Sequence, residues 1–276
     1  MFYKEMYIDV PFDYEKYNLN REECKAVIVN YVTDISPEMG RHNRPAVLIC
    51  PGGGYDFVSD REGEPIAMEL LSKGIQCFVL KYCCVKKPFP LNLLQAAAAL
   101  AYIRKNAYDF DINPDDITVM GFSAGGHLAG SLAVHWNKDF VKEPFGFTTE
   151  HKPNALVLCY PVISVTDTHE GSINNLLCAD ASDENKKRIS LEINVDADTP
   201  KTFIWHCADD GCVPVSNSLR FAAALNEKKV PFALHIFEKG DHGLALANHV
   251  SAINESQINE DAADWMGLVV KWIYNK

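Results

Sequence analysis

The chain has 276 residues, a hydrophobic content of 47% and a formal net charge of −11 at pH 7. This length fits one large α/β domain, and the apolar content is enough for a sizeable core. The negative charge argues against nucleic acid or an anionic membrane as the main partner, and no apolar run is long enough to span a bilayer.

Nine cysteines are scattered along the chain, and several lie in apolar runs, where cysteine acts as a small hydrophobe. No C-x-x-C pair is present, so we expect no metal site and no cofactor. The first residues lack the basic and then apolar pattern of a secretory signal. These features predict reduced thiols and a cytoplasmic location. They leave the oligomeric state open, with a homo-oligomer as one alternative.

Strand-like and helix-like segments alternate along the chain. In chain order, we predict strands at 25–32, 45–50, 75–80, 117–120, 155–160, 202–206 and 232–237. We predict helices at 64–73, 91–108, from 124 onward, 218–229 and 262–274. The strands are continuous apolar runs, which is typical of a parallel sheet covered by helices on both faces. No repeat or low-complexity linker interrupts this order, so we expect a single domain.

Residues 161–199 are polar and break the alternation of strands and helices. The segment is too long for an ordinary connection. One interpretation is a solvated surface excursion, and the other is a cap over the site. The cap is favoured because the segment leaves from the end of a predicted strand, where ligands bind in parallel sheets.

The most informative motif is G-x-S-x-G at Gly121, Ser123 and Gly125. It lies between a predicted strand and a predicted helix. A sharp turn at this junction would expose the Ser123 hydroxyl, and the glycines remove side chains that would clash in so tight a bend. The context therefore favours a nucleophilic serine over a structural turn.

A serine nucleophile needs a base that takes its proton, and in this strand order an acid and then a histidine should follow it. His242 lies in a glycine-flanked loop after the last predicted strand. The competitors are less suitable: His127 is expected to face the core, and His206 and His235 lie within strands. We therefore predict His242 as the base.

The acid should follow a strand between the serine and the histidine, and two adjacent aspartates, Asp209 and Asp210, meet this condition. Neighbours in the chain cannot both point at one imidazole. Asp210 lies four residues before Pro214, and Gly211 permits a turn behind it. We predict Asp210 as the acid and Asp209 as a turn or surface carboxylate.

The oxyanion of an acyl-transfer reaction needs backbone N–H donors that are held in place beforehand. We expect one from Ala124, the residue after the nucleophile. The other should come from the glycine loop after strand 45–50, at Gly52 or Gly53. A flexible turn or a phosphate loop is the alternative, but no G-K-[ST] follows the glycines.

Together these motifs resemble the α/β-hydrolase superfamily, from about residue 45 to the C-terminus. The resemblance is strongest to bacterial carbohydrate-esterase-like hydrolases such as acetyl xylan esterases, and it is weaker to hormone-sensitive-lipase-like esterases. It implies the triad Ser123, Asp210 and His242 and a mostly parallel sheet with a small cap-like insertion at 161–199.

Three positions depart from the lipase-like pattern. Pro51 stands where those relatives have histidine, Cys83 follows Tyr82 where they often have arginine, and Gln95 stands where they often have aspartate. The last two suggest a lost structural ion pair and leave the triad intact.

The function expected from these residues is hydrolysis of small carboxylic esters, with short acyl groups on sugars as substrates. Tyr55, His169 and Ser172 are the expected substrate contacts. Two alternatives stay open: a prolyl-oligopeptidase-like peptidase or amidase, and a catalytically silent protein that binds small molecules on the same fold.

Overall fold

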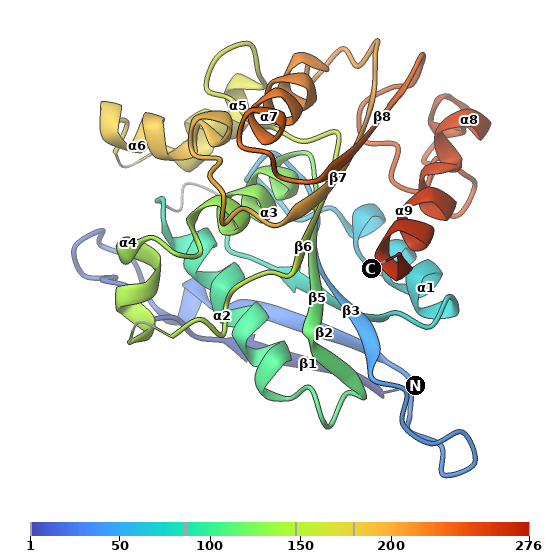
Figure 1. Ribbon diagram of the computed structural model, residues 1–276. Helices are drawn as coiled ribbons and strands as arrows, with labels where there is room; N and C mark the ends of the chain where they lie inside the picture. The colour runs from blue at the N-terminus through green and yellow to red at the C-terminus, as the bar shows by residue number, and fades with distance from the viewer. Residues whose placement is uncertain (1, 85–87, 147, 179, 276) are drawn as a thin grey trace.

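The computed structural model describes residues 2–84, 88–146, 148–178 and 180–275, with the side chains of residues 2 and 3 left aside. Eight strands form one sheet in the order β1-β2-β4-β3-β5-β6-β7-β8 (Figure 1). They are β1 (Phe2–Ile8), β2 (Ala26–Val32), β3 (Arg44–Cys50), β4 (Gln76–Lys81), β5 (Ile112–Phe122), β6 (Ala155–Cys159), β7 (Lys201–Cys207) and β8 (Phe232–Phe237).

The sheet is parallel from β4 to β8, and β2 pairs antiparallel with both β1 and β4. The expected fold class, a mostly parallel sheet between layers of helices, is therefore confirmed. All the predicted strands are present. β1 was not predicted, because Lys4 and Glu5 interrupt its apolar pattern at an edge where one side is open.

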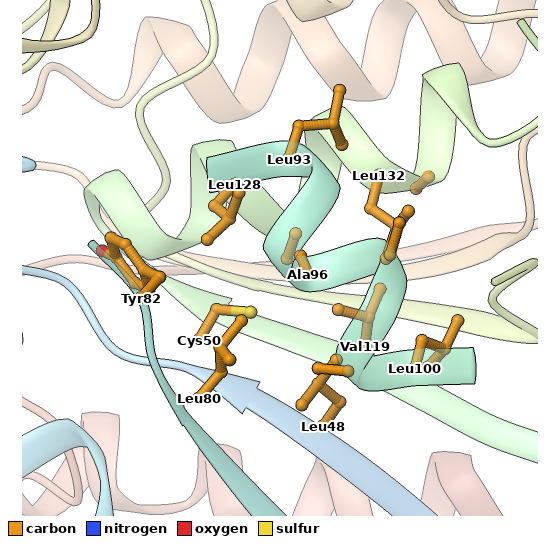
Figure 2. Packing of buried hydrophobic residues seen from close by; sticks show 14 of the residues in the cluster. Leu48, Cys50, Leu80, Tyr82, Leu93, Ala96, Leu100, Val119, Leu128 and Leu132 are labelled. Atoms are coloured by element: carbon orange, nitrogen blue, oxygen red, sulfur yellow. The ribbon is translucent and has the colours of Figure 1, made fainter. Parts of the chain in front are cut away.

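Alternate residues of the central strands enter two separate cores. In β3, Leu48 and Cys50 pack on one face, and Val47 and Ile49 pack on the other. Figure 2 shows the first core, where Leu128 and other side chains of the helices close over Leu48 and Cys50. Burial on both faces explains why these strands are continuous apolar runs.

Helices cover both faces of the sheet (Figure 1). On one face lie α2 (Leu91–Lys105), α3 (Ala124–His135), α4 (Asp139–Lys142), α5 (Glu170–Leu176), α6 (Asp183–Ile189) and α7 (Ser216–Glu227). On the other face lie α1 (Glu64–Ser72), α8 (Glu260–Ala263) and α9 (Trp265–Tyr274). The predicted helix 262–274 is divided at Asp264, and the helix predicted over 91–108 ends at Lys105.

Segment 161–199 contains α5, α6 and a short 3-10 turn at Leu191–Ile193. It is not a solvated excursion throughout, since Ile173, Leu176 and Ile189 are buried in the first core. The single-domain organisation stays a prediction.

Gln95, one of the positions that depart from the lipase-like pattern, makes hydrogen bonds between neutral groups. Its side-chain oxygen accepts from the backbone N–H of Cys83 at 2.9 Å, and its amide donates to the carbonyl of Cys24 at 2.7 Å. The side chain is fully buried. The buried polar groups at positions 83 and 95 therefore have hydrogen-bond partners, and none of these partners is charged.

Candidate active site

Ser123 forms the sharp bend between β5 and α3, with φ of 51° and ψ of −119°. The bend brings two glycines against backbone atoms. A Cβ at Gly121 would lie 2.0 Å from the carbonyl oxygen of Gly125, and a Cβ at Gly125 would lie 2.1 Å from that of Cys50. No larger residue fits at either position, and the glycines thus permit the strained conformation that projects the Ser123 side chain from the sheet.

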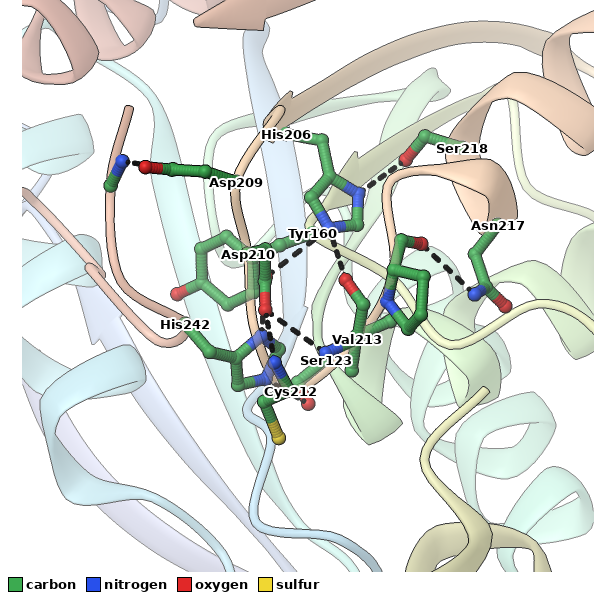
Figure 3. A network of polar contacts seen from close by, with 12 residues as sticks. Ser123, Tyr160, His206, Asp209, Asp210, Cys212, Val213, Asn217, Ser218 and His242 are labelled. Carbon is green, nitrogen blue, oxygen red and sulfur yellow. Dashed lines mark hydrogen bonds and ion pairs between the residues drawn. The ribbon is translucent and has the colours of Figure 1, made fainter. Parts of the chain in front are cut away.

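Three loops at the carboxyl end of the sheet bring Ser123, His242 and Asp210 together (Figure 3). His242 Nε2 lies 2.8 Å from Ser123 Oγ, and His242 Nδ1 lies 2.7 Å from Asp210 Oδ2. The carboxylate accepts a hydrogen bond from Nδ1–H, so in the neutral ring Nε2 is left unprotonated and faces the serine hydroxyl. This arrangement can remove a proton from Ser123 when it attacks a carbonyl.

Asp210 and Asp209 point to different partners. Asp210 Oδ1 accepts the backbone N–H groups of Cys212 and Val213, both at 2.9 Å. The exposed Asp209 accepts the backbone N–H of Gly240 at 2.7 Å. Asp210 therefore orients the imidazole, while Asp209 holds the start of the loop that carries it.

Asp210 is charged although its side chain is almost fully buried. Burial by itself would raise the pKa of the Asp210 carboxyl, but hydrogen bonds from His206, His242 and the backbone of Val213 lower that pKa well below its usual range. A permanent carboxylate at this point would stabilise a positive charge on the neighbouring His242 ring.

The glycine loop after β3 differs from the prediction in one respect. The N–H of Gly52 is already used, because it donates to Glu62 Oε2 at 2.7 Å. It is not available to an oxyanion, so Gly52 is corrected from a donor to an anchor of the loop. Among the described residues we find no partner for the N–H of Gly53, and the N–H of Ala124 belongs to the unsatisfied first turn of α3.

Glu62, which the sequence analysis did not single out, holds this loop. Its carboxylate is buried and also accepts the Tyr160 hydroxyl at 2.7 Å. Burial and the charge of Glu62 raise the pKa of Tyr160, which keeps the hydroxyl protonated as a donor. The neighbouring Arg61 donates to the carbonyls of Ser251 and Gly243, beside His242. No local pattern marks Glu62 as special, because its partners are distant in sequence.

A cavity of about 640 Å³ opens beside the serine. Most of the residues that line it are polar residues or glycines, and among the described lining residues Phe57 is the one with a large apolar side chain, 60% exposed. The insertion contributes His169, Gly171 and Asn175 to the wall. Part of segment 161–199 therefore borders the cavity directly.

Of the three expected substrate contacts, only His169 lines the cavity. Tyr55 is buried, and its hydroxyl donates to Nδ1 of the buried His127 at 2.8 Å. Ser172 is fully buried and contacts His169 Nδ1 through its hydroxyl at 2.9 Å and its backbone N–H at 3.2 Å. We therefore correct Tyr55 and Ser172 to supporting residues behind the cavity wall.

The described part of the chain contains no group of three or more His, Cys, Asp or Glu side chains placed to hold a metal ion. None of its helices is both long and apolar enough to cross a membrane.

A family model described as BD-FAE matches residues 34–225. The chain belongs to the BD-FAE family. It is 34% identical to a solved acetyl ester-xyloside bifunctional hydrolase from Caldicellulosiruptor lactoaceticus, with a TM-score of 0.79 and coverage of 96% of this chain and 94% of that one. Its fold is that of the α/β-hydrolases, as the resemblance implied.

Two curated relatives of this BD-FAE member are longer proteins. Endo-1,4-beta-xylanase B of Butyrivibrio fibrisolvens is 42% identical over 74% of this chain and 33% of its own length. The acetylxylan esterase of Xylanibacter ruminicola is 29% identical over 91% of this chain and 50% of its own length. The chain thus spans about a third of the first relative's length and half of the second's.

Proposed function

We propose that this protein hydrolyses carboxylic esters by acyl transfer through Ser123, His242 and Asp210. The observation that carries the proposal is the continuous chain of contacts from Ser123 Oγ to His242 at 2.8 Å and from His242 to Asp210 at 2.7 Å, at the edge of an open cavity. Serine hydrolases use this constellation on several unrelated folds.

In the proposed reaction, His242 Nε2 takes the hydroxyl proton while Ser123 Oγ bonds to the ester carbonyl carbon. The N–H groups of Gly53 and Ala124 stabilise the oxyanion that forms. The tetrahedral intermediate then expels the alcohol, which receives the proton from His242. A water molecule activated by the same imidazole releases the acid and restores Ser123.

The experiment that tests the activity combines a fluorophosphonate probe with hydrolysis of p-nitrophenyl acetate and of an aminoacyl-naphthylamide. An esterase reacts covalently with the probe and cleaves the acetate ester. Cleavage of the naphthylamide with no ester hydrolysis would instead indicate a peptidase, and no reaction with either substrate or probe would indicate a binding protein.

The proposed substrates are short acyl esters, acetyl groups on sugars above all. The polar residues and glycines among the cavity's lining residues support this class, as does the name of the acetylxylan esterase relative. We expect kcat/KM for p-nitrophenyl acetate and propionate to exceed that for the octanoate ester by on the order of tenfold or more, because among the described lining residues Phe57 alone offers a large apolar side chain to a long acyl chain. A higher value for the octanoate would contradict this.

His169 is the proposed contact for the alcohol part of the substrate. Its Nδ1 accepts the backbone N–H of Ser172, so the neutral ring carries its proton on Nε2 and can donate a hydrogen bond. We expect His169→Ala to lower kcat/KM for acetylated sugars by on the order of 10-fold, and to change it little for p-nitrophenyl acetate, whose leaving group needs little recognition.

His169→Gln is the matched control, because its amide can donate from nearly the position of Nε2. It should retain most activity on acetylated sugars. Equal losses on both substrates, together with a lower melting temperature for both variants, would show that His169 only holds the insertion in place.

A further inference from the structure

A second histidine contacts the same carboxylate oxygen of Asp210 that His242 contacts. His206, at the end of β7, is fully buried, and its Nε2 lies 3.2 Å from Asp210 Oδ2 (Figure 3). The sequence analysis interpreted it only as a strand residue. It lies within the core and not in the cavity, so it does not touch substrate.

The neighbours of His206 determine which ring nitrogen carries a proton. Nε2 faces two groups that can only accept, the Asp210 carboxylate and the carbonyl of Val213 at 2.9 Å. Nε2 must therefore be protonated. Nδ1 faces the buried Ser218 hydroxyl at 2.8 Å, which can donate to a neutral ring or accept from a charged one.

With this contact, Asp210 has a complete set of donors. Oδ1 receives the backbone N–H groups of Cys212 and Val213, and Oδ2 receives the ring N–H groups of His242 and His206. The ring N–H groups of His242 and His206 thus share the single oxygen Oδ2. A proton shared with His206 leaves less negative charge to stabilise the protonated ring of His242.

We propose that His206 is a positioning residue. It fixes the Asp210 carboxylate and reduces the stabilisation that this carboxylate gives to a protonated His242 ring, so that His242 remains unprotonated, and the enzyme active, in more acidic solution. This proposal rests on the proposed triad. The expected effect on His242 has the same direction whether His206 is neutral or charged, since either form directs an N–H group with a positive hydrogen toward Asp210 Oδ2.

The acid limb of the pH profile is the range in which kcat/KM falls as the solution becomes more acidic. Four neighbouring titratable side chains do not account for such a fall. Burial and Asp210 raise the pKa of Cys207 to about 12 and also raise that of Cys212. Tyr160, whose ring centre lies 5.2 Å from that of His242, has a raised pKa and donates to Glu62. Asp209 points away to Gly240.

Two amide variants separate positioning from packing. In His206→Gln the amide nitrogen can reach the place of Nε2 and donate to Asp210, whereas in His206→Asn the amide lies near Nδ1, and the donor to Asp210 is lost. Both are neutral, and both remove the ring. The readout is the acid limb of kcat/KM for p-nitrophenyl acetate, measured between pH 4.5 and 8, together with the melting temperature of each variant.

We expect the acid limb of His206→Asn to move up by on the order of 0.5–1 pH unit, and that of His206→Gln to remain near the original. If both variants lose stability and keep the original acid limb, or if both shift equally, His206 is only a core residue and the proposal is wrong.

A measurement on the unaltered protein keeps the test decisive if the variants do not fold. In histidine-labelled protein, ¹H–¹⁵N spectra at pH 7 should show His206 protonated on Nε2. An unprotonated Nε2 would overturn the proposal. Failure of the triad itself is distinguishable, because the unaltered protein would then show neither ester hydrolysis nor reaction with a fluorophosphonate.

Discussion

Replacement of Ser123 by alanine should lower kcat for p-nitrophenyl acetate by on the order of 10³-fold or more, because it removes the hydroxyl that His242 Nε2 contacts and that would form the acyl-enzyme. The small activity that remains would come from substrate binding and the N–H groups of Gly53 and Ala124. The measurement is steady-state hydrolysis, combined with loss of fluorophosphonate labelling.

The variant should fold normally, since among the described residues the Ser123 hydroxyl makes one hydrogen bond, to His242. Alanine keeps the Cβ that serine already places at this bend, so the substitution adds no backbone strain and the melting temperature should stay near the original. Near-original activity in a folded Ser123→Ala protein would show that Ser123 is not the nucleophile.

The second large effect is expected from Asp210→Asn, with a loss in kcat on the order of 10³–10⁴-fold. Each carboxylate oxygen of Asp210 accepts two N–H groups, from the backbone on one side and from His206 and His242 on the other. In either orientation, the asparagine amide would turn its NH₂ toward two donors. His242 would lose its acceptor or the loop would lose its anchor.

Asp209→Asn is the matched control in the adjacent position. Asp209 is exposed and accepts a single backbone N–H, which the amide oxygen of asparagine can still accept. We expect this variant to keep kcat within a few-fold of the original. Equal losses in the two variants, or a larger loss for Asp209→Asn, would contradict the role given to Asp210.

The sequence alone predicted strands β2 to β8 in order, helices α1, α2, α3, α7 and α9, and the sharp bend at Ser123. Strands buried on both faces must be continuous apolar runs, and the bend at Ser123 requires glycine on both sides, so these features appear in local pattern. The glycine-flanked loop that carries His242 was recognisable for the same reason. The edge strand β1 was missed, because an edge imposes a weaker pattern.

Only the tertiary structure decided which groups of the site are free and which are already bound. Gly52 and Gly53 are equivalent in sequence, and the distant Glu62 occupies the N–H of only one. The Tyr55 hydroxyl is hydrogen-bonded to His127, and the His206 ring is hydrogen-bonded to Asp210. Hydrogen bonds between distant residues leave no periodic trace in a sequence, because they depend on where the folded chain brings single donors and acceptors together.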